Sequence, residues 1–337
     1  MGKIAVIGAG SMGTAMAVCQ AAAGRKVVLW DRKPDMLDNI KETHENARYL
    51  PGVKVPGSVA LCADEAEALE GAGFVLFAVP SQHFRAVLTR MAPHIPSGAV
   101  IVNTAKGVEQ GSLLRLSEVA AELMPGRPYA VLSGPSHAEE IGRLMPTVVT
   151  ASSADPQVAR LVRQQFITDT FRIYLNDDLT GVELGGALKN IIALASGVAE
   201  GLGFGDNARA ALMTRGMVEM ARLGVAMGAK SDTFFGLSGA GDLIVTCTSQ
   251  HSRNHRCGIL IGQGMAPDEA AAQIGMVVEG IAAANAAYAL SQKYAVRMPI
   301  TSGLHLILHE KFDPMEAGAL LMSRGREYES EDLFRAR

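Results

Sequence analysis

The chain has 337 residues, of which 48% are hydrophobic and 19% are charged. This is an ordinary globular composition, and the length allows two domains that each bury a hydrophobic core. The formal net charge is −3 and the lysines and arginines are spread along the chain, so we expect no nucleic-acid partner.

From the sequence we expect neither a signal peptide nor a membrane span. A predicted strand begins at residue 3, which leaves no room for a signal peptide, and no apolar run reaches the length of a membrane span. Four cysteines lie far apart without a Cys-x-x-Cys pair, which predicts free thiols in a reduced cytoplasm. His251 and His255 have no third ligand nearby, so we expect no metal site.

The first half of the chain alternates short runs of β-branched and apolar residues with helical patterns. Apolar strands separated by helices are typical of a parallel sheet that is covered on both faces. We therefore predict a doubly wound, Rossmann-type α/β domain for dinucleotide binding over residues 1–184. Its predicted strands are Lys3–Ile7, Val27–Trp30, Phe74–Val79, Ala99–Val102, Tyr129–Leu132 and Thr147–Ala151.

The strand signals stop near Asp178. Beyond it, apolar residues recur at helical spacing in Val182–Glu200, Ala208–Met227 and Ala282–Leu290. This pattern predicts an all-helical, substrate-binding domain over residues 185–330. A short charged tail, residues 331–337, follows it.

Gly8, Gly10 and Gly13 form a GxGxxG pattern directly after the first strand and at the start of a helix. Gly8 allows a tight turn, Gly10 lets the backbone approach a pyrophosphate, and Gly13 permits close packing of helix and strand. The free amides at the helix start can then bind the pyrophosphate. Asp31, at the end of the second strand, completes the dinucleotide-binding pattern.

The residues after the second strand leave the choice between NAD and NADP open. Asp31 can accept a hydrogen bond from a ribose 2′-hydroxyl, which favours NAD. Arg32 and Lys33 can hold a 2′-phosphate, which favours NADP, although a solvated cluster of charges would look the same. We expect both cofactors to be used, with a modest preference for NADP.

Three later segments combine residue types that are suited to catalysis. Residues 103–107 (Asn-Thr-Ala-Lys-Gly) follow a predicted strand, at the edge where open α/β sheets place their ligands. Lys189 lies in an otherwise apolar helix, so it must face a cleft or carry a large desolvation cost. Residues 241–247 and 252–254 place an acid, hydroxyls and an arginine close together in the sequence.

With these segments the sequence resembles the soluble bacterial-type NAD(P)-dependent glycerol-3-phosphate dehydrogenases, from about residue 3 to residue 325. The stretches that carry the resemblance are GAGSMGTA, NTAKG, LSGPSHAEE, ELGGALKNIIALASGVAEGLGFGDNARAAL, GAGDLIVTCTSQHSRN and VVEG. One departure is Met12, where the family usually has an aromatic residue. This departure leaves open how the cofactor packs at that position.

The resemblance implies reversible NAD(P)H-dependent reduction of dihydroxyacetone phosphate to sn-glycerol 3-phosphate, which supplies the glycerol backbone for phospholipid synthesis. It also implies a cytoplasmic homodimer. Lys189 would be the general acid and base, assisted by Lys106 and Asp242. The substrate would contact Lys106, Gly134, Ser136, Lys189, Asp242, Ser252, Arg253 and Asn254. Besides Gly8, Gly10, Gly13 and Asp31, the cofactor would contact Ser11, Met12, Arg32, Lys33, Tyr49, Lys106, Ala138, Arg253, Val277 and Glu279.

The physical chemistry of the side chains agrees with these implied roles. A free lysine has a pKa of about 10.4, which is too high for efficient proton exchange at neutral pH. Burial and the nearby charge of Lys106 would lower the pKa of Lys189, whereas Asp242 would act in the opposite direction. Arg253 suits a phosphate because its guanidinium can bond two oxygens at once. We expect the reaction in a cleft between the two domains.

Two other functions fit parts of the pattern. A 3-hydroxyacid dehydrogenase of the same architecture would have a comparable Lys-Asn pair, but it binds a carboxylate and does not need the segment around Arg253. A non-catalytic nicotinamide sensor would use the glycine-rich turn and have no use for two positioned lysines. Fold alone is a poor guide between such alternatives.

Overall fold

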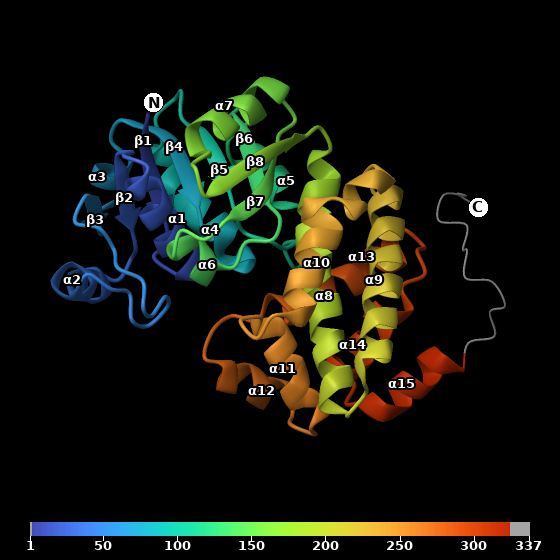
Figure 1. The fold of residues 1–337 in the computed structure, drawn as a ribbon. Helices are drawn as coiled ribbons and strands as arrows, with labels where there is room; N and C mark the ends of the chain where they lie inside the picture. The colour runs from blue at the N-terminus through green and yellow to red at the C-terminus, as the bar shows by residue number, and fades with distance from the viewer. Residues whose placement is uncertain (1, 324–337) are drawn as a thin grey trace. The chain divides into compact units, whose positions relative to one another are not determined.

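The computed structural model describes residues 2–323, and its contacts divide the chain into two compact units (Figure 1). Within the described residues, the first unit comprises residues 2–105 and 116–179, and the second comprises residues 106–115 and 180–323. The sequence predicts a single boundary after residue 184. The structure differs in that residues 106–115, which precede this boundary, belong to the helical unit. The predicted charged tail, residues 331–337, lies outside the described residues.

The first unit is built on an eight-stranded sheet with the order β3-β2-β1-β4-β5-β6-β7-β8. Neighbouring strands are parallel except for the antiparallel pair β6 and β7. The strand order reverses at β1, which is where doubly wound sheets bind ligands beyond their carboxyl ends. The strands are β1 (Lys3–Ile7), β2 (Val27–Trp30), β3 (Val59–Cys62), β4 (Ala72–Phe77), β5 (Val100–Asn103), β6 (Tyr129–Ser133), β7 (Thr147–Ser152) and β8 (Phe171–Asn176).

All six predicted strands are present, and the Rossmann-type sheet is confirmed. The prediction missed β3 and β8, which are the two edges of the sheet. In β8, buried Phe171 and Ile173 alternate with exposed Arg172 and Tyr174. An edge strand that is solvated on one side lacks the continuous apolar run by which the inner strands are recognised.

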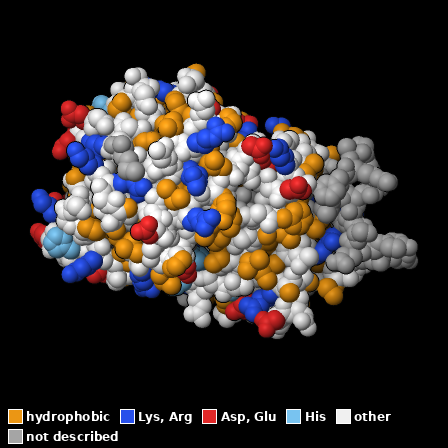
Figure 2. All heavy atoms as spheres, turned by 45° about the horizontal axis from the view of Figure 1, so that its top comes forward, with side chains coloured by type: hydrophobic (Ala, Val, Ile, Leu, Met, Phe, Trp, Pro, Cys, Tyr) orange, Lys and Arg blue, Asp and Glu red, His pale blue; other side chains and the backbone are white. Residues whose placement is uncertain are grey.

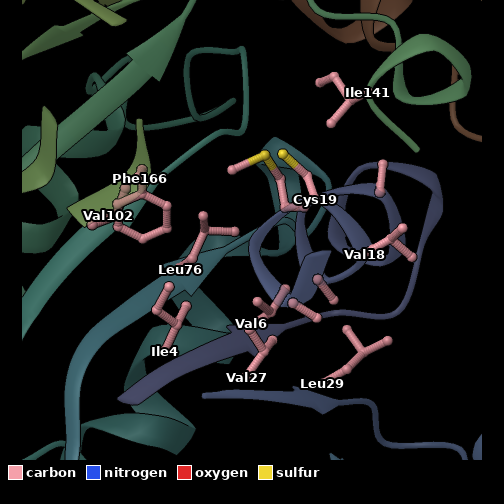
Figure 3. Packing of buried hydrophobic residues seen from close by; sticks show 14 of the residues in the cluster. Ile4, Val6, Val18, Cys19, Val27, Leu29, Leu76, Val102, Ile141 and Phe166 are labelled. Atoms are coloured by element: carbon pink, nitrogen blue, oxygen red, sulfur yellow. The ribbon is translucent and has the colours of Figure 1, made fainter. Parts of the chain in front are cut away.

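Helices cover both faces of this sheet. Ile4 and Val6 of β1 belong to a core cluster with Val18 and Cys19 of helix α1 (Figure 3). The alternate residues of β1 are also fully buried, on the other face, where the ring of Phe77 lies 5.4 Å from that of Phe84 in α4. The helices are α1 (Ser11–Ala22), α2 (Pro34–Thr43), α3 (Glu65–Leu69), α4 (Phe84–Met91), α5 (Leu116–Leu123), α6 (Ala138–Gly142) and α7 (Pro156–Phe166).

The second unit is helical, as the sequence predicts. Within the described residues that follow Asn176, all regular structure consists of α-helices and short 3₁₀ or π turns. Apolar side chains from α8, α9, α11, α13 and α14 form one core cluster. The helices are α8 (Leu179–Gly201), α9 (Asp206–Ala226), α10 (Asp242–Thr248), α11 (Arg253–Gly262), α12 (Pro267–Ile274), α13 (Glu279–Lys293), α14 (Pro299–His309) and α15 (Pro314–Met322).

Helix α8 is the centre of the second unit. By length and composition it could cross a membrane, but 94% of its most apolar window is buried inside the protein, as in the core helix of a globular unit. It packs closely on α11 because both helices carry glycines at the crossing. A Cβ atom on Gly197 would lie 2.1 Å from the carbonyl oxygen of His255, and one on Gly258 would lie 2.1 Å from that of Leu194.

The surface carries a mixture of side-chain types. Figure 2 shows one face of the molecule, on which hydrophobic side chains lie among lysines, arginines and acidic residues. Apolar atoms normally contribute more than half of a folded protein's surface, so single exposed hydrophobic residues need no special explanation. The residues with candidate functions are therefore better sought among buried polar groups.

Candidate active site

The glycine-rich turn between β1 and α1 has the backbone that its sequence predicts. Gly8 has φ +103°, a conformation that favours glycine, and a Cβ on Gly13 would lie 1.8 Å from the Gly8 carbonyl oxygen. Gly10 differs, because its φ of −74° suits any residue and no described atom lies within 4 Å of where its Cβ would be. The protein's own packing does not require glycine at position 10, whereas a phosphate approaching the backbone would.

The start of α1 fits an anionic group. This helix has 12 residues, and no side chain in the described chain caps its N-terminus. Its first amide groups and the positive end of the helix dipole therefore face the same point, which suits a pyrophosphate. The residues present thus fit NAD(P), which the turn and α1 would hold by its phosphates.

Asp31 is tied to this turn. Its Oδ2 accepts a hydrogen bond from the Ala9 N–H at 3.0 Å, and its Oδ1 accepts one from the Lys33 N–H at 3.2 Å. Each carboxylate oxygen keeps a second lone pair with which it can meet a ribose hydroxyl. Arg32 and Lys33 are exposed at the start of α2. The acid and the two cations are therefore next to each other beside the turn.

The other predicted cofactor residues of the first unit surround α1. The Ser11 hydroxyl donates a hydrogen bond to the carbonyl oxygen of Tyr49 at 2.6 Å, which brings these two residues together. Met12 is half-buried against the core, and Ala138 begins helix α6, which packs on α1. The sequence reasoning missed Asn46, whose buried side chain donates to the Ala9 carbonyl oxygen at 2.8 Å. No local motif marks it.

Gly134 and Ser136 lie in the turn that follows β6. Gly134 has φ +139°, and a Cβ there would lie 3.1 Å from the Cα of Val149. The Ser136 hydroxyl donates to the Gly134 carbonyl oxygen at 2.8 Å. In parallel strands the carboxyl ends meet at one edge of the sheet, so this turn lies on the same edge as the glycine-rich turn.

A cluster of buried charges lies in the second unit. Asp242, the first residue of α10, is 2% exposed and has a lysine on each carboxylate oxygen. The Lys106 Nζ donates to Oδ2 at 2.6 Å, and the Lys189 Nζ lies 3.1 Å from Oδ1. The structure therefore brings together the three residues that the resemblance implies for catalysis, from positions up to 136 residues apart.

Thr246 completes this cluster, and the sequence reasoning did not assign it. The Lys189 Nζ donates to its hydroxyl oxygen at 2.6 Å, and that hydroxyl donates to the Asp242 carbonyl oxygen at 2.5 Å. An ammonium has three N–H groups, so Thr246 and Asp242 hold Lys189 and leave it one donor. The signal in the sequence is the spacing of four residues between Asp242 and Thr246, which places both on one face of a helix.

The cluster changes the protonation of its members. Burial, with a smaller contribution from the charge of Lys106, lowers the pKa of Lys189 to about 8, although Asp242 acts in the opposite direction. Burial alone would raise the pKa of Asp242, but the two lysines outweigh it and hold that pKa below its ordinary value. Near neutral pH the cluster therefore holds a carboxylate and a Lys189 that can release a proton.

Residues 106–115 are fastened to the helices of the second unit. Val108 belongs to the helical core, and Arg115 forms a buried ion pair with Glu183 of α8 at 2.8 Å. The sequence reasoning missed this pair because its members are 68 residues apart. The pair fixes the far end of the segment that begins with Lys106. It thereby helps to place Lys106 opposite Asp242.

The proposed phosphate segment begins α11. The Ser252 hydroxyl caps the helix by accepting from the His255 N–H at 3.2 Å, and half-buried Arg253 is the first helical residue. Asn254 is already engaged: its Nδ2 donates to Asn190 Oδ1 at 2.8 Å, and its Oδ1 accepts from the Gly280 N–H at 2.9 Å. Asn254 therefore joins α8, α11 and α13, and it keeps one N–H for a ligand.

Val277 and Glu279 lie at the start of α13. Val277 is 44% exposed, and Glu279 is the first residue of the helix, next to Gly280. The hydrogen bond between Gly280 and Asn254 ties this helix start to α11. Within residues 2–323 there is no group of three or more His, Cys, Asp or Glu side chains that could hold a metal ion.

Comparisons with known proteins agree with this arrangement. The family models for the N-terminus and C-terminus of NAD-dependent glycerol-3-phosphate dehydrogenase match residues 3–159 and 178–319. Two relatives named glycerol-3-phosphate dehydrogenase (NAD(P)+), from Moorella thermoacetica and Pelotomaculum thermopropionicum, are 52% and 51% identical. Each alignment covers 98% of this chain, and it covers 98% and 96% of the respective relative.

A solved structure of a glycerol-3-phosphate dehydrogenase is also similar to this chain. The crystal structure of glycerol-3-phosphate dehydrogenase from Coxiella burnetii matches with a TM-score of 0.92 at 43% identity, over 96% of this chain and 99% of that one. Its likeness extends over both units of the fold. The chain therefore belongs to the family of NAD-dependent glycerol-3-phosphate dehydrogenases.

Proposed function

We propose that this protein is a glycerol-3-phosphate dehydrogenase that interconverts dihydroxyacetone phosphate and sn-glycerol 3-phosphate with NAD(P)H or NAD(P)+. The observation that carries the proposal is the cluster of Lys189, Asp242 and Lys106 in a chain of this family. A buried lysine whose pKa is about 8 can give and take a proton near neutral pH.

Bound NAD(P)H supplies the hydride that adds to the ketone carbon. The residues of the chain supply the proton and the electrostatics. The Lys189 Nζ donates its remaining proton to the ketone oxygen, which becomes the hydroxyl of the product. In the reverse direction the neutral amine takes that proton back. The Lys106 side chain, on the other oxygen of Asp242, stabilises the negative charge that develops on the ketone oxygen.

Asp242 and Thr246 position Lys189 for this transfer. The carboxylate offsets part of the repulsion between the two lysines, and the Thr246 hydroxyl accepts one ammonium hydrogen. Together they engage two of the three ammonium hydrogens and leave the third for the substrate. The preorganised donors need no reorganisation during the reaction, and this is the usual source of electrostatic catalysis.

The substrate phosphate is assigned to Arg253 and the start of α11. An arginine can bind two phosphate oxygens at once, and the first amides of a ten-residue helix add backbone donors. Ser252 already caps this helix, so its role is to shape the helix start. A substrate with a carboxylate in place of the phosphate, as in a 3-hydroxyacid dehydrogenase, would use these donors less fully.

Steady-state kinetics test the proposal directly. Oxidation of NADH and of NADPH is measured with dihydroxyacetone phosphate, and reduction of NAD+ and NADP+ is measured with a simple 3-hydroxyacid. We expect turnover only with the phosphorylated substrate. Turnover only with the hydroxyacid would make the protein a 3-hydroxyacid dehydrogenase. Cofactor binding without any turnover would make it a nicotinamide sensor.

We further propose that the protein acts as a cytoplasmic homodimer that supplies glycerol 3-phosphate for phospholipid synthesis. Membership of the family supports the proposal as a whole. The four cysteines, which are free and buried, support a reducing compartment such as the cytoplasm. Light scattering coupled to size-exclusion chromatography measures the mass directly. A mass equal to that of one 35.5 kDa chain would contradict the dimer.

A further inference from the structure

The side chains of Asp31 and Asn46, with a longer contact of 3.5 Å from the Thr14 hydroxyl, bind the backbone of the glycine-rich turn at Ala9. Asp31 accepts the hydrogen bond of the Ala9 N–H, and Asn46 donates from Nδ2 to the Ala9 carbonyl oxygen at 2.8 Å. Asn46 lies 37 residues further along the chain and is 1% exposed. The peptide units before and after Ala9 are therefore both anchored by buried or half-buried side chains.

The bond from Asn46 determines where the next amide points. A trans peptide unit is planar, with its carbonyl and its N–H on opposite sides. The Ala9 carbonyl shares its peptide unit with the N–H of Gly10. Because Asn46 holds that carbonyl toward the interior, the Gly10 N–H is directed away from Asn46. Gly10 borders open space on the side where a Cβ would be.

Asn46 is itself fixed by all of its polar atoms. Its Nδ2 also donates to the Thr14 hydroxyl oxygen at 2.8 Å, and its Oδ1 accepts from the Tyr49 N–H at 3.3 Å. The surrounding loop is anchored by Leu50 and Val53, which are buried in the core of the first unit. A rotation of the amide would place Oδ1 against the Ala9 carbonyl, where two acceptors would repel each other.

The same side chain also places a predicted cofactor contact. Asn46 accepts the hydrogen bond of the Tyr49 N–H, and the carbonyl oxygen of Tyr49 accepts one from the Ser11 hydroxyl at 2.6 Å. Ser11 is the first residue of α1. Asn46 therefore connects the backbone of the turn, the start of the helix and the loop that carries Tyr49.

We propose that Asn46 is a positioning residue for the dinucleotide, which it does not touch. It holds the Ala9–Gly10 peptide so that the Gly10 N–H faces the pyrophosphate, and it brings Tyr49 to the same side. The inference rests on the cofactor named in the proposed function. Because the turn is ordered before the ligand arrives, binding does not carry the cost of ordering it.

The decisive variant is Asn46→Asp, because the aspartate side chain has the same shape as that of asparagine. It keeps an acceptor for Tyr49, but it sets a carboxylate oxygen against the Ala9 carbonyl, so the peptide turns away. Asn46→Ala is a second variant that removes the bond without repulsion, in case the charged one does not fold. The matched control is Thr14→Val, which removes a buried hydroxyl and its long 3.5 Å bond to the Ala9 carbonyl, and leaves the 2.8 Å bond from Asn46 to that carbonyl in place.

Calorimetric titration measures binding to the full-length protein in the absence of substrate, and thermal unfolding is followed in parallel. The probes are NADPH, NADH and ADP-ribose, which share the pyrophosphate. We expect Asn46→Asp and Asn46→Ala to raise all three Kd values by a similar factor, roughly 10- to 100-fold, as for a misdirected hydrogen bond to a charged group. Thr14→Val should lower the Tm and leave each Kd within about two-fold of the wild type, because the shorter bond from Asn46 to the Ala9 carbonyl, which directs the Gly10 N–H, is retained.

Other results would overturn the inference. Unchanged Kd values in a folded Asn46 variant would mean that the side chain only stabilises the fold. An equal loss of affinity in Thr14→Val, which keeps the bond from Asn46 to Ala9, would mean that Asn46 is not the residue that positions the peptide. Failure of the wild type to bind NADPH or NADH would contradict the proposed function itself, and the wild-type titration alone detects it.

Discussion

The Nζ of Lys189 lies 3.1 Å from Oδ1 of Asp242, and both side chains are almost completely buried. Asp242 also binds Lys106, so one carboxylate serves two cations and the cluster carries a net positive charge when both lysines are protonated. Burial is the main reason why the pKa of Lys189 is low; the charge of Lys106 adds to it, and Asp242 opposes it. The net positive charge makes the cluster attractive to an oxygen on which negative charge develops.

The pH dependence of the rate should report Lys189. Ketone reduction requires its ammonium form, so kcat/KM for dihydroxyacetone phosphate should be constant below pH 8 and fall as the pH rises through the pKa of about 8. Oxidation of glycerol 3-phosphate requires the neutral amine, so its kcat/KM should rise over the same range. Profiles that bend in the same direction for both reactions would contradict this assignment.

Replacement of Lys189 tests whether its side chain transfers the proton. Lys189→Ala should fold and bind NADPH, because it removes a buried cation and leaves the glycine-rich turn intact. Its kcat should fall by roughly 10²–10⁴-fold, the loss typical of a general acid. Lys293→Ala, at the exposed end of α13, is the control and should behave like the wild type. Small amines should restore part of the lost rate.

Removal of the charge of Asp242 should shift this profile. Asp242→Asn deletes the group that raises the pKa of Lys189, so the downward limb of ketone reduction should move to lower pH. The variant also leaves buried Lys189 and half-buried Lys106 without an anion, which costs about 3–5 kcal/mol of unfolding free energy when both are charged. Because Lys189 loses its proton as the pH rises, denaturant melts should show a smaller loss at pH 9 than at pH 6.

Arg253 should determine affinity for the phosphate. Arg253→Ala should raise KM for dihydroxyacetone phosphate by roughly 10- to 100-fold, because it removes charge-assisted hydrogen bonds. Turnover of dihydroxyacetone, which has no phosphate, should be poor in the wild type and little affected by the change. Arg256→Ala, an exposed arginine on the same helix, is the matched control. Equal effects of the two substitutions would exclude a specific clamp.

The cations beside Asp31 should set the preference between cofactors. Replacing both Arg32 and Lys33 with alanine should weaken NADPH much more than NADH, since only NADPH carries the 2′-phosphate. Asp31 stays in place through its bond to the Ala9 N–H. Kd values for the two cofactors measure the difference. An equal loss for both would mean that the pair is only a solvated end of the strand.

The crossing of α8 and α11 should not tolerate even one methyl group. Gly197→Ala places a Cβ 2.1 Å from the His255 carbonyl oxygen and should cost at least 1–3 kcal/mol of unfolding free energy, about the range for overpacking. Gly303→Ala is the control within α14, where nothing described lies within 4 Å of the new atom. It should stabilise the protein by about 0.5–1 kcal/mol. Denaturant midpoints distinguish the two.

The sequence by itself determined the features that are encoded over short windows. The strand, glycine-rich turn and helix at Gly8–Gly13 are contiguous, so their order alone predicts a dinucleotide site. The helical periodicity after Asp178 predicts the second unit. Lys189 is conspicuous because it is charged in an apolar helix. Two edge strands escaped prediction because solvation interrupts their hydrophobic pattern.

Only the tertiary structure decided which distant residues meet. Lys189 and Thr246 are 57 residues apart, Arg115 and Glu183 are 68 apart, and Lys106 and Asp242 are 136 apart. No local pattern marks the pairing itself, since the contact exists only after helices and loops have packed around a common core. For the same reason the sequence pattern does not reveal Asn46: a buried amide becomes recognisable as part of a site only when the carbonyl that it binds is known.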